Sequence, residues 1–223
     1  MSEPKRDPAE SMDPDAAQAW VTRWEQGETQ WHRDEVNPDL MAHVGPWRRV
    51  LVPLCGASLD VAWLAERGME VVGVELSAIP CQRLFEQWGR TPRIEPADAP
   101  DDPYTRYISP PVTVLQGDVL ALRPGHAGTF DGVWDRGALV ALDPSLRADY
   151  LAALSRVAHG AELLLSTFHY AEGVMEGPPF SVDEAFIEAS FDRVERLDER
   201  GAELASDVAA VSRLHRARIR PFR

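Results

Sequence analysis

Lysine and cysteine are almost absent from this sequence of 223 residues, and each scarcity excludes a class of chemistry. Among the 23 basic residues only Lys5 is a lysine, so a Schiff-base lysine is implausible and no phosphate loop of the GxxxxGK[ST] type is present. The two cysteines, Cys55 and Cys81, are too few for a disulfide scaffold, and their spacing does not match a zinc site. No other cluster of histidine, cysteine, aspartate and glutamate has the spacing of metal ligands. We therefore expect no metal site.

Positive charge and long apolar runs are scarce as well. Acidic residues outnumber basic residues by 36 to 23, which gives a net charge of −13. Such a surface repels phosphate backbones, so we expect no nucleic-acid partner. No run approaches the roughly 18 apolar residues of a membrane span, and residues 1–20 lack the apolar core of a signal peptide. We therefore predict a cytoplasmic protein without a membrane partner. Because nothing in the sequence demands an oligomer, we expect a monomer.

The rest of the composition is that of one globular domain. Hydrophobic residues make up 44% of the chain and charged residues 26%, which is ordinary for such a protein. Residues 1–12 are polar and contain two prolines, so they are predicted to be a disordered tail. Residues 13–223 are predicted to form a single domain.

The strongest pattern is an alternation of short apolar runs with helical segments over residues 49–88. Residues 49–54 and 70–75 are rich in valine and predict buried strands, and each is followed by a segment of helical periodicity. This order is typical of an α/β fold with a parallel sheet and right-handed crossovers. Further strands are predicted at residues 112–115, 130–134, 161–168, 191–197 and 208–219. Further helices are predicted at residues 14–26, 38–44, 144–158 and 182–189.

Residues 89–103 do not fit either pattern. They contain four prolines and predict an irregular surface connector. A mobile cover over a site is the alternative interpretation of this segment.

Candidate ligand-binding residues follow the predicted strands, because ligands of open α/β sheets bind beyond the carboxyl ends of the strands. Glu75 lies 19 residues beyond Gly56 (75 − 56), the offset at which an acidic residue accepts hydrogen bonds from ribose hydroxyls. The loop at Gly56 has one glycine rather than the three of a GxGxxG motif, which disfavours a dinucleotide-dependent oxidoreductase. A nucleoside ligand without phosphates, such as S-adenosylmethionine, fits this loop better.

Several segments resemble the thiopurine S-methyltransferase family. The longest is RVLVPLCGASLDVAWLAERGMEVVGVELS at residues 49–77. The others are RW at Arg23-Trp24 followed by Gly27, WH at Trp31-His32, VNPDL at residues 36–40, DRGALVAL at 135–142 and GPPFSV at 177–182. They occur in the order of the family and span roughly residues 20–190.

This resemblance implies a Rossmann-like seven-stranded methyltransferase sheet, mostly parallel with a reversed C-terminal strand pair and with helices on both faces. It also implies S-adenosylmethionine as methyl donor and the sulfur of a small, aromatic or heterocyclic thiol as acceptor. The residues expected at the cofactor are Trp24, Leu54, Gly56, Glu75, Asp118, Val119 and Arg136. Trp31 and Phe180 are expected to border the acceptor, whereas Trp20, Trp63 and Trp134 fall on apolar faces and are predicted to be core residues.

Arg136 and Asp135 are the candidate catalytic residues. Arg136 is expected to stabilise negative charge on the acceptor, and Asp135 is expected to assist there or, alternatively, to cap a neighbouring loop. The sequence departs from the family at Ala57, where lysine is usual, at Met69, where histidine is usual, and at Trp31, where phenylalanine is usual. These departures concern the acceptor more than the donor. The alternatives are therefore a methyltransferase for thiocyanate, halide, selenium or tellurium oxyanions, and a non-catalytic cofactor-binding module.

Overall fold

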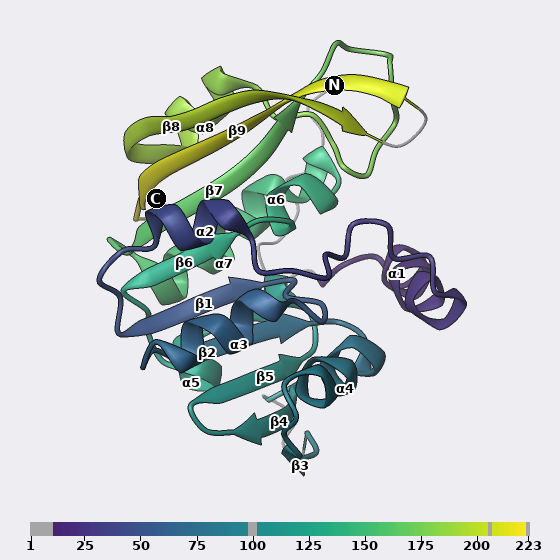
Figure 1. The fold of residues 1–223 in the computed structure, drawn as a ribbon, viewed down its shortest axis with the longest axis vertical. Helices are drawn as coiled ribbons and strands as arrows, with labels where there is room; N and C mark the ends of the chain where they lie inside the picture. Colours follow the sequence, from purple (N-terminus) through teal and green to yellow (C-terminus); the bar gives the residue numbers. More distant parts are fainter. Residues whose placement is uncertain (1–10, 98–101, 205–206, 222–223) are drawn as a thin grey trace, which may run out of the picture.

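The computed structural model of the protein describes residues 11–97, 102–204 and 207–221. These residues build one mixed sheet of nine strands in the order β3-β4-β5-β2-β1-β6-β7-β9-β8 (Figure 1). The five central strands run parallel, as predicted. They are β1 (Arg49–Pro53), β2 (Glu70–Glu75), β5 (Val112–Gln116), β6 (Gly132–Asp135) and β7 (Glu162–His169).

The two edges of the sheet are antiparallel. At one edge, β9 (Val208–Ile219) pairs with β7, and β8 (Phe191–Leu204) pairs with β9, which confirms the reversed C-terminal pair. At the other edge, β4 (Thr105–Ser109) pairs with β5, and β3 (Arg93–Glu95) pairs with β4.

The strands β3 and β4 were not predicted, so the sheet has nine strands rather than seven. Strand β3 falls inside the segment 89–103 that was predicted to be an irregular connector, of which residues 98–101 lie outside the described residues. It has only three residues, and an edge strand that short carries no hydrophobic alternation for a sequence pattern to detect. Strand β4 reads TRYIS, and only Tyr107 in it is buried.

Helices cover both faces of the sheet because successive strand residues point to opposite faces. On one face Val50 and Val52 of β1 belong to a cluster with Val61 and Leu64. These two residues come from α3 (Leu59–Glu66), and α4 (Ala78–Gln87) contributes to the same cluster. On the other face Leu51 packs in a cluster that includes residues of α7 (Arg147–Ala158).

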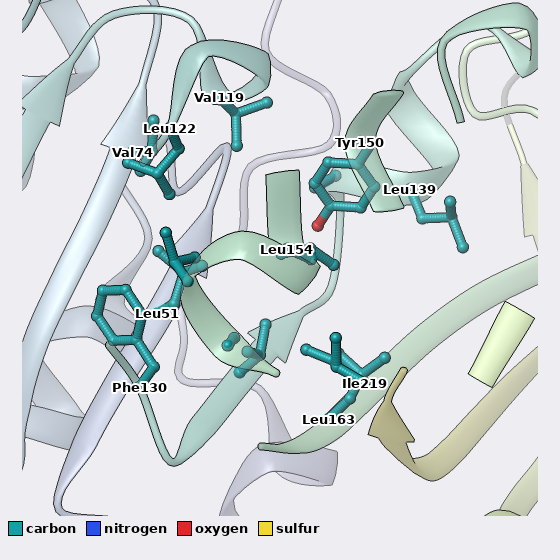
Figure 2. Packing of buried hydrophobic residues seen from close by; sticks show 14 of the residues in the cluster. Leu51, Val74, Val119, Leu122, Phe130, Leu139, Tyr150, Leu154, Leu163 and Ile219 are labelled. Carbon is teal, nitrogen blue, oxygen red and sulfur yellow. The ribbon is translucent and has the colours of Figure 1, made fainter. Parts of the chain in front are cut away.

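Figure 2 shows this second cluster, in which Leu51, Leu154 and Leu163 are fully or almost fully buried. The shorter helices are α5 (Pro124–Ala127), α6 (Ala138–Ala141) and α8 (Glu184–Ser190), with 3-10 turns η1 (Val119–Ala121) and η2 (Pro144–Leu146). Within the described ranges, no helix combines the length and the apolar character that crossing a membrane requires.

The first helix and the turns after it, at residues 14–35, lie beyond the carboxyl ends of the parallel strands (Figure 1). Helix α1 (Pro14–Gln26) begins at the N-cap Asp13, whose carboxylate accepts two backbone hydrogen bonds, and it ends at Gly27 in the left-handed conformation. A segment of turns then leads to α2 (Pro38–His43), which Asn37 caps.

The predicted tail at residues 1–12 lies mostly outside the described residues. Met12, which is described, is buried rather than exposed as a tail residue would be. Its side chain is buried in the core, and its backbone N–H donates to Asp118 Oδ2 at 2.6 Å. Met12 is therefore part of the packed core.

Candidate active site

A cavity of about 490 Å³ lies at the carboxyl ends of β1, β2, β5 and β6. Its volume is in the range of sites for small organic molecules. Helix α1 and the segment after it form one wall of the cavity, and the ends of the strands form another. Eight of the predicted site residues line it, namely Trp24, Trp31, Leu54, Gly56, Glu75, Asp118, Val119 and Arg136.

Glu75, the last residue of β2, is a buried carboxylate held by two backbone donors. Its Oε2 accepts the N–H of Gly56 at 3.0 Å, and its Oε1 accepts the N–H of Ser77 at 2.8 Å. Burial raises the pKa of Glu75 to about 7, although the hydrogen bonds from Ser77 and Gly56 act in the opposite direction. Each carboxylate oxygen has two acceptor sites, so the ionised group retains capacity for a further donor such as a ribose hydroxyl.

The loop between β1 and α3 turns sharply beneath the cavity. Leu54 has φ 47° and Gly56 has φ 53°, both in the left-handed region. A Cβ at residue 56 would lie 3.2 Å from Cζ2 of Trp24, which is tighter than most real contacts. Glycine at this position therefore allows the indole of Trp24 to lie directly against the loop.

Three indoles from the N-terminal part of the chain form an aromatic wall. The Trp31 ring meets those of Trp20 and Trp24 edge-to-face, at centroid distances of 5.2 and 5.9 Å. Trp20, predicted as a core residue, is only half-buried and lines the cavity. It also packs against the core cluster of Leu51, so the core prediction holds in part, with Trp20 lying between that cluster and the cavity.

Arg136 follows β6 and is half-buried in the cavity wall. Its Nη1 donates to the main-chain oxygen of Trp31 at 2.8 Å. Burial lowers the pKa of Arg136, and the neighbouring Asp60 charge raises it. Within the described part of the chain no carboxylate forms a salt bridge with this guanidinium.

Asp135 lies outside the lining of the cavity, contrary to the predicted catalytic role. Its side chain is 1% exposed and accepts hydrogen bonds from the Tyr150 hydroxyl at 2.8 Å and from the backbone N–H groups of Ala138 and Leu139. The carboxylate thus caps the turn that begins α6 and ties it to α7. This arrangement supports the capping alternative.

Phe180 is also absent from the lining, contrary to its predicted place beside the acceptor. Its ring lies over Gly177, and its backbone N–H donates to the oxygen of Val140 at 2.7 Å. The prolines of the same motif, Pro178 and Pro179, line the cavity instead. The motif therefore reaches the cavity through its two prolines rather than through Phe180.

Other lining residues were not among the predicted site residues. Glu203 and Leu204 reach the cavity from the end of β8, and an antiparallel strand gives no strand-end motif that would single them out. His32 also lines the cavity; its Nε2 is buried without a hydrogen-bond partner among the described residues, and burial lowers its pKa. Asp60 is a further lining residue, and it lies within the motif quoted for the cofactor loop.

The comparisons with known proteins agree with this geometry. The family model described as "Thiopurine S-methyltransferase (TPMT)" matches residues 15–215. A relative from Pseudomonas paraeruginosa named "Thiopurine S-methyltransferase" is 40% identical over 189 residues, which cover 82% of this chain and 85% of the relative. A relative of the same name from Xanthobacter autotrophicus is 40% identical over 177 residues, covering 77% of this chain and 80% of the relative.

Solved structures show the same fold at low sequence identity. A Burkholderia thailandensis 1,6-didemethyltoxoflavin-N1-methyltransferase, solved with S-adenosylhomocysteine, matches with a TM-score of 0.62 at 19% identity over 98% of this chain and 93% of that one. An S-adenosylmethionine-dependent methyltransferase from Anabaena variabilis matches with a TM-score of 0.59 at 13% identity, over 96% of this chain and 100% of that one. These likenesses confirm the predicted fold class, and the sequence relatives confirm the family. The chain belongs to the thiopurine S-methyltransferase family of S-adenosylmethionine-dependent methyltransferases.

Proposed function

We propose that this S-adenosylmethionine-dependent methyltransferase acts on the sulfur of a small aromatic or heterocyclic thiol. The observation that carries the proposal is Arg136, a cation without a carboxylate partner among the described residues, set into a cavity with an aromatic wall. A flat, anionic acceptor satisfies both features.

The residues present fit S-adenosylmethionine. Glu75 has free acceptor capacity for ribose hydroxyls, and Asp118 and Val119 line the cavity after β5, where the adenine end is expected. Trp24 and the Leu54–Gly56 turn lie beside them and would hold the methionine end. The loop has no cradle for a pyrophosphate, so a nucleoside without phosphates suits it.

When bound, the cofactor supplies a methyl group already activated on a sulfonium. The indoles of Trp24 and Trp31 offer apolar faces that attract a cation and exclude water. Arg136 places a positive charge in the part of the cavity where the acceptor thiolate would bind. This charge lowers the pKa of the acceptor thiol. The acceptor is thereby ionised without a strong general base, and the protein's main contributions are alignment and exclusion of water.

The first experiment is methyl transfer from S-adenosylmethionine to 6-mercaptopurine, read by mass spectrometry of the product. We expect S-methylated product at a rate well above that of a reaction without protein. The Arg136→Ala variant serves as the matched control, because it removes the charge that the proposal depends on. Wild-type protein that binds S-adenosylhomocysteine but methylates no thiol would overturn the proposal in favour of an inorganic nucleophile or a non-catalytic role.

We further propose that the protein works in the cytoplasm as a monomer. Sedimentation velocity would test this, since a dimer at micromolar concentration would contradict it.

A further inference from the structure

Asp60 is a buried carboxylate in the wall of the cavity, and the proposed reaction gives it no task. It lies in the first turn of α3, one turn beyond the loop that carries Gly56, and its side chain is 3% exposed. A buried carboxylate is costly unless its oxygens are hydrogen-bonded. Its partners therefore show what it holds in place.

Both oxygens of Asp60 bind donors from distant parts of the chain. Oδ1 accepts the backbone N–H of Asn37 at 2.8 Å, and Oδ2 accepts Nε1 of Trp134 at 2.8 Å. Asn37 lies 23 residues before Asp60, and Trp134 lies 74 residues after it. One side chain thus joins the N-terminal wall, the cofactor loop and β6.

These bonds belong to a closed ring around the acceptor end of the cavity. Trp134 precedes Arg136 by two residues, and Arg136 donates to the main-chain oxygen of Trp31. Trp31 is connected through the chain to Asn37, which returns to Asp60. Two of the three hydrogen bonds in this ring end on Asp60, so it is the group on which the ring depends most.

Asp60 also influences the charge at the site. Its carboxylate is near enough to Arg136 to oppose the effect of burial on that guanidinium. It is not within salt-bridge distance of Arg136, so the guanidinium remains available to an anion in the cavity.

We infer that Asp60 is a positioning residue, which fixes Arg136 and Trp31 relative to the cofactor loop so that the acceptor is aligned with the methyl donor. This inference rests on the proposed function. According to this inference, the two halves of the cavity depend on different contacts. On the ribose side, Glu75 and Gly56 are hydrogen-bonded to each other without Asp60, whereas the acceptor side depends on the hydrogen bonds of Asp60.

The test is the Asp60→Asn variant, which keeps the size of the side chain but places an amide N–H against one of the two donors. We expect kcat/KM for the thiol to fall by about 100-fold, the effect of a small misplacement of reacting groups. The Kd for S-adenosylhomocysteine should change by less than about tenfold, because the ribose site is separate. In the complex with S-adenosylhomocysteine, the backbone amides of residues 27–37 should exchange hydrogen faster than in wild type.

Asp131→Asn is the matched control. Asp131 lies at the opposite end of β6, is half-exposed, and accepts the backbone N–H groups of Arg48 and Arg49. It thus also joins a strand end to β6, but it does not line the cavity. This variant should lose thermal stability while keeping the wild-type kcat/KM.

A double-mutant cycle with Arg136→Ala distinguishes positioning from a general structural effect. If Asp60 acts through Arg136, then Asp60→Asn adds little further loss of kcat/KM in the Arg136→Ala background. Fully additive losses, or wild-type exchange at residues 27–37 in Asp60→Asn, would overturn the inference. If Asp60→Asn does not fold, Trp134→Phe can replace it, because it removes one of the two donors to Asp60. This variant should likewise lower kcat/KM for the thiol while leaving the Kd for S-adenosylhomocysteine nearly unchanged.

Failure of the proposed function would be recognised separately. Wild-type protein without activity on any thiol would overturn the proposed acceptor, whereas the exchange and binding measurements would still decide whether Asp60 fixes the N-terminal wall.

Discussion

The carboxylate of Glu75 and the backbone N–H of Gly56 are joined by a hydrogen bond of 3.0 Å, so the end of β2 fixes the turn that follows β1. The two residues are 19 positions apart in the sequence because α3 and β2 lie between them. They meet because β1 and β2 are neighbouring parallel strands, whose carboxyl ends lie side by side. The same carboxylate also accepts the N–H of Ser77 and is left with acceptor sites that face the cavity. The part of the cavity where we propose that the ribose binds is thus formed without a ligand.

Replacing Glu75 with alanine should weaken the binding of S-adenosylhomocysteine by about 1–3 kcal/mol, because ligand hydroxyls lose their acceptor in a buried place. Isothermal titration calorimetry measures the change. Glu70→Ala is the control, since Glu70 begins the same strand and pairs with Arg49 away from the cavity. Equal affinity of wild type and Glu75→Ala would refute the placement of the ribose.

Cofactor affinity should depend on pH because burial raises the pKa of Glu75 to about 7. Only the ionised carboxylate accepts hydrogen bonds at both oxygens, so protonation competes with the ribose. Affinity should be constant above pH 7 and weaken by about tenfold for each pH unit below it. Calorimetry of S-adenosylhomocysteine binding between pH 5.5 and 8.5, values chosen to lie about 1.5 units on either side of this pKa, checks the profile. Glu75→Gln should abolish the pH dependence.

Arg136→Ala should reduce kcat/KM for an ionisable thiol by about 100-fold or more, as expected when a donor to developing or existing charge is removed. Because the guanidinium lowers the pKa of the bound thiol, the acid limb of the pH–rate profile should move to higher pH in the variant. Arg136→Lys, which keeps the charge but not the forked geometry, should recover part of the activity. An unchanged acid limb would contradict the role in ionising the acceptor.

Asp135→Asn and Tyr150→Phe should lower the free energy of unfolding by about 1–3 kcal/mol each, because the first removes the charge to which the backbone N–H groups and the Tyr150 hydroxyl donate, and the second removes that hydroxyl. Urea denaturation followed by circular dichroism measures this loss. The Kd for S-adenosylhomocysteine should remain at the wild-type value in both variants. A large effect of Asp135→Asn on kcat, with stability unchanged, would restore the catalytic interpretation of this residue.

The central fold was predictable because its signals are local. Buried parallel strands are continuous apolar runs, and the runs at residues 49–54 and 70–75 coincide with β1 and β2. The positions after these strands then follow from topology, which is why Gly56, Glu75 and Arg136 were placed at the cavity from spacing and motif alone.

The remaining features depend on contacts that no local pattern contains. A buried carboxylate after a strand can face a cavity or cap the next helix, and only the position of Tyr150 shows that Asp135 does the second. Phe180 and its neighbouring prolines share one motif, but the direction of each side chain depends on the backbone of the turn. Likewise, the apolar side of α1 gave no indication that Trp20 lines a cavity in addition to packing against the core.

The hydrogen bond between Arg136 and Trp31 spans 105 residues, and this distance affects how the protein assembles during synthesis. Residues 14–36 leave the ribosome before β1, β2 and β6, so the surface that they cover does not yet exist when they emerge. The three tryptophans can contact one another as soon as they emerge, but the hydrogen bond that Arg136 donates to Trp31 cannot form until residue 136 has been made. The wall of the cavity that is translated first is therefore completed only after more than half of the chain has been synthesised.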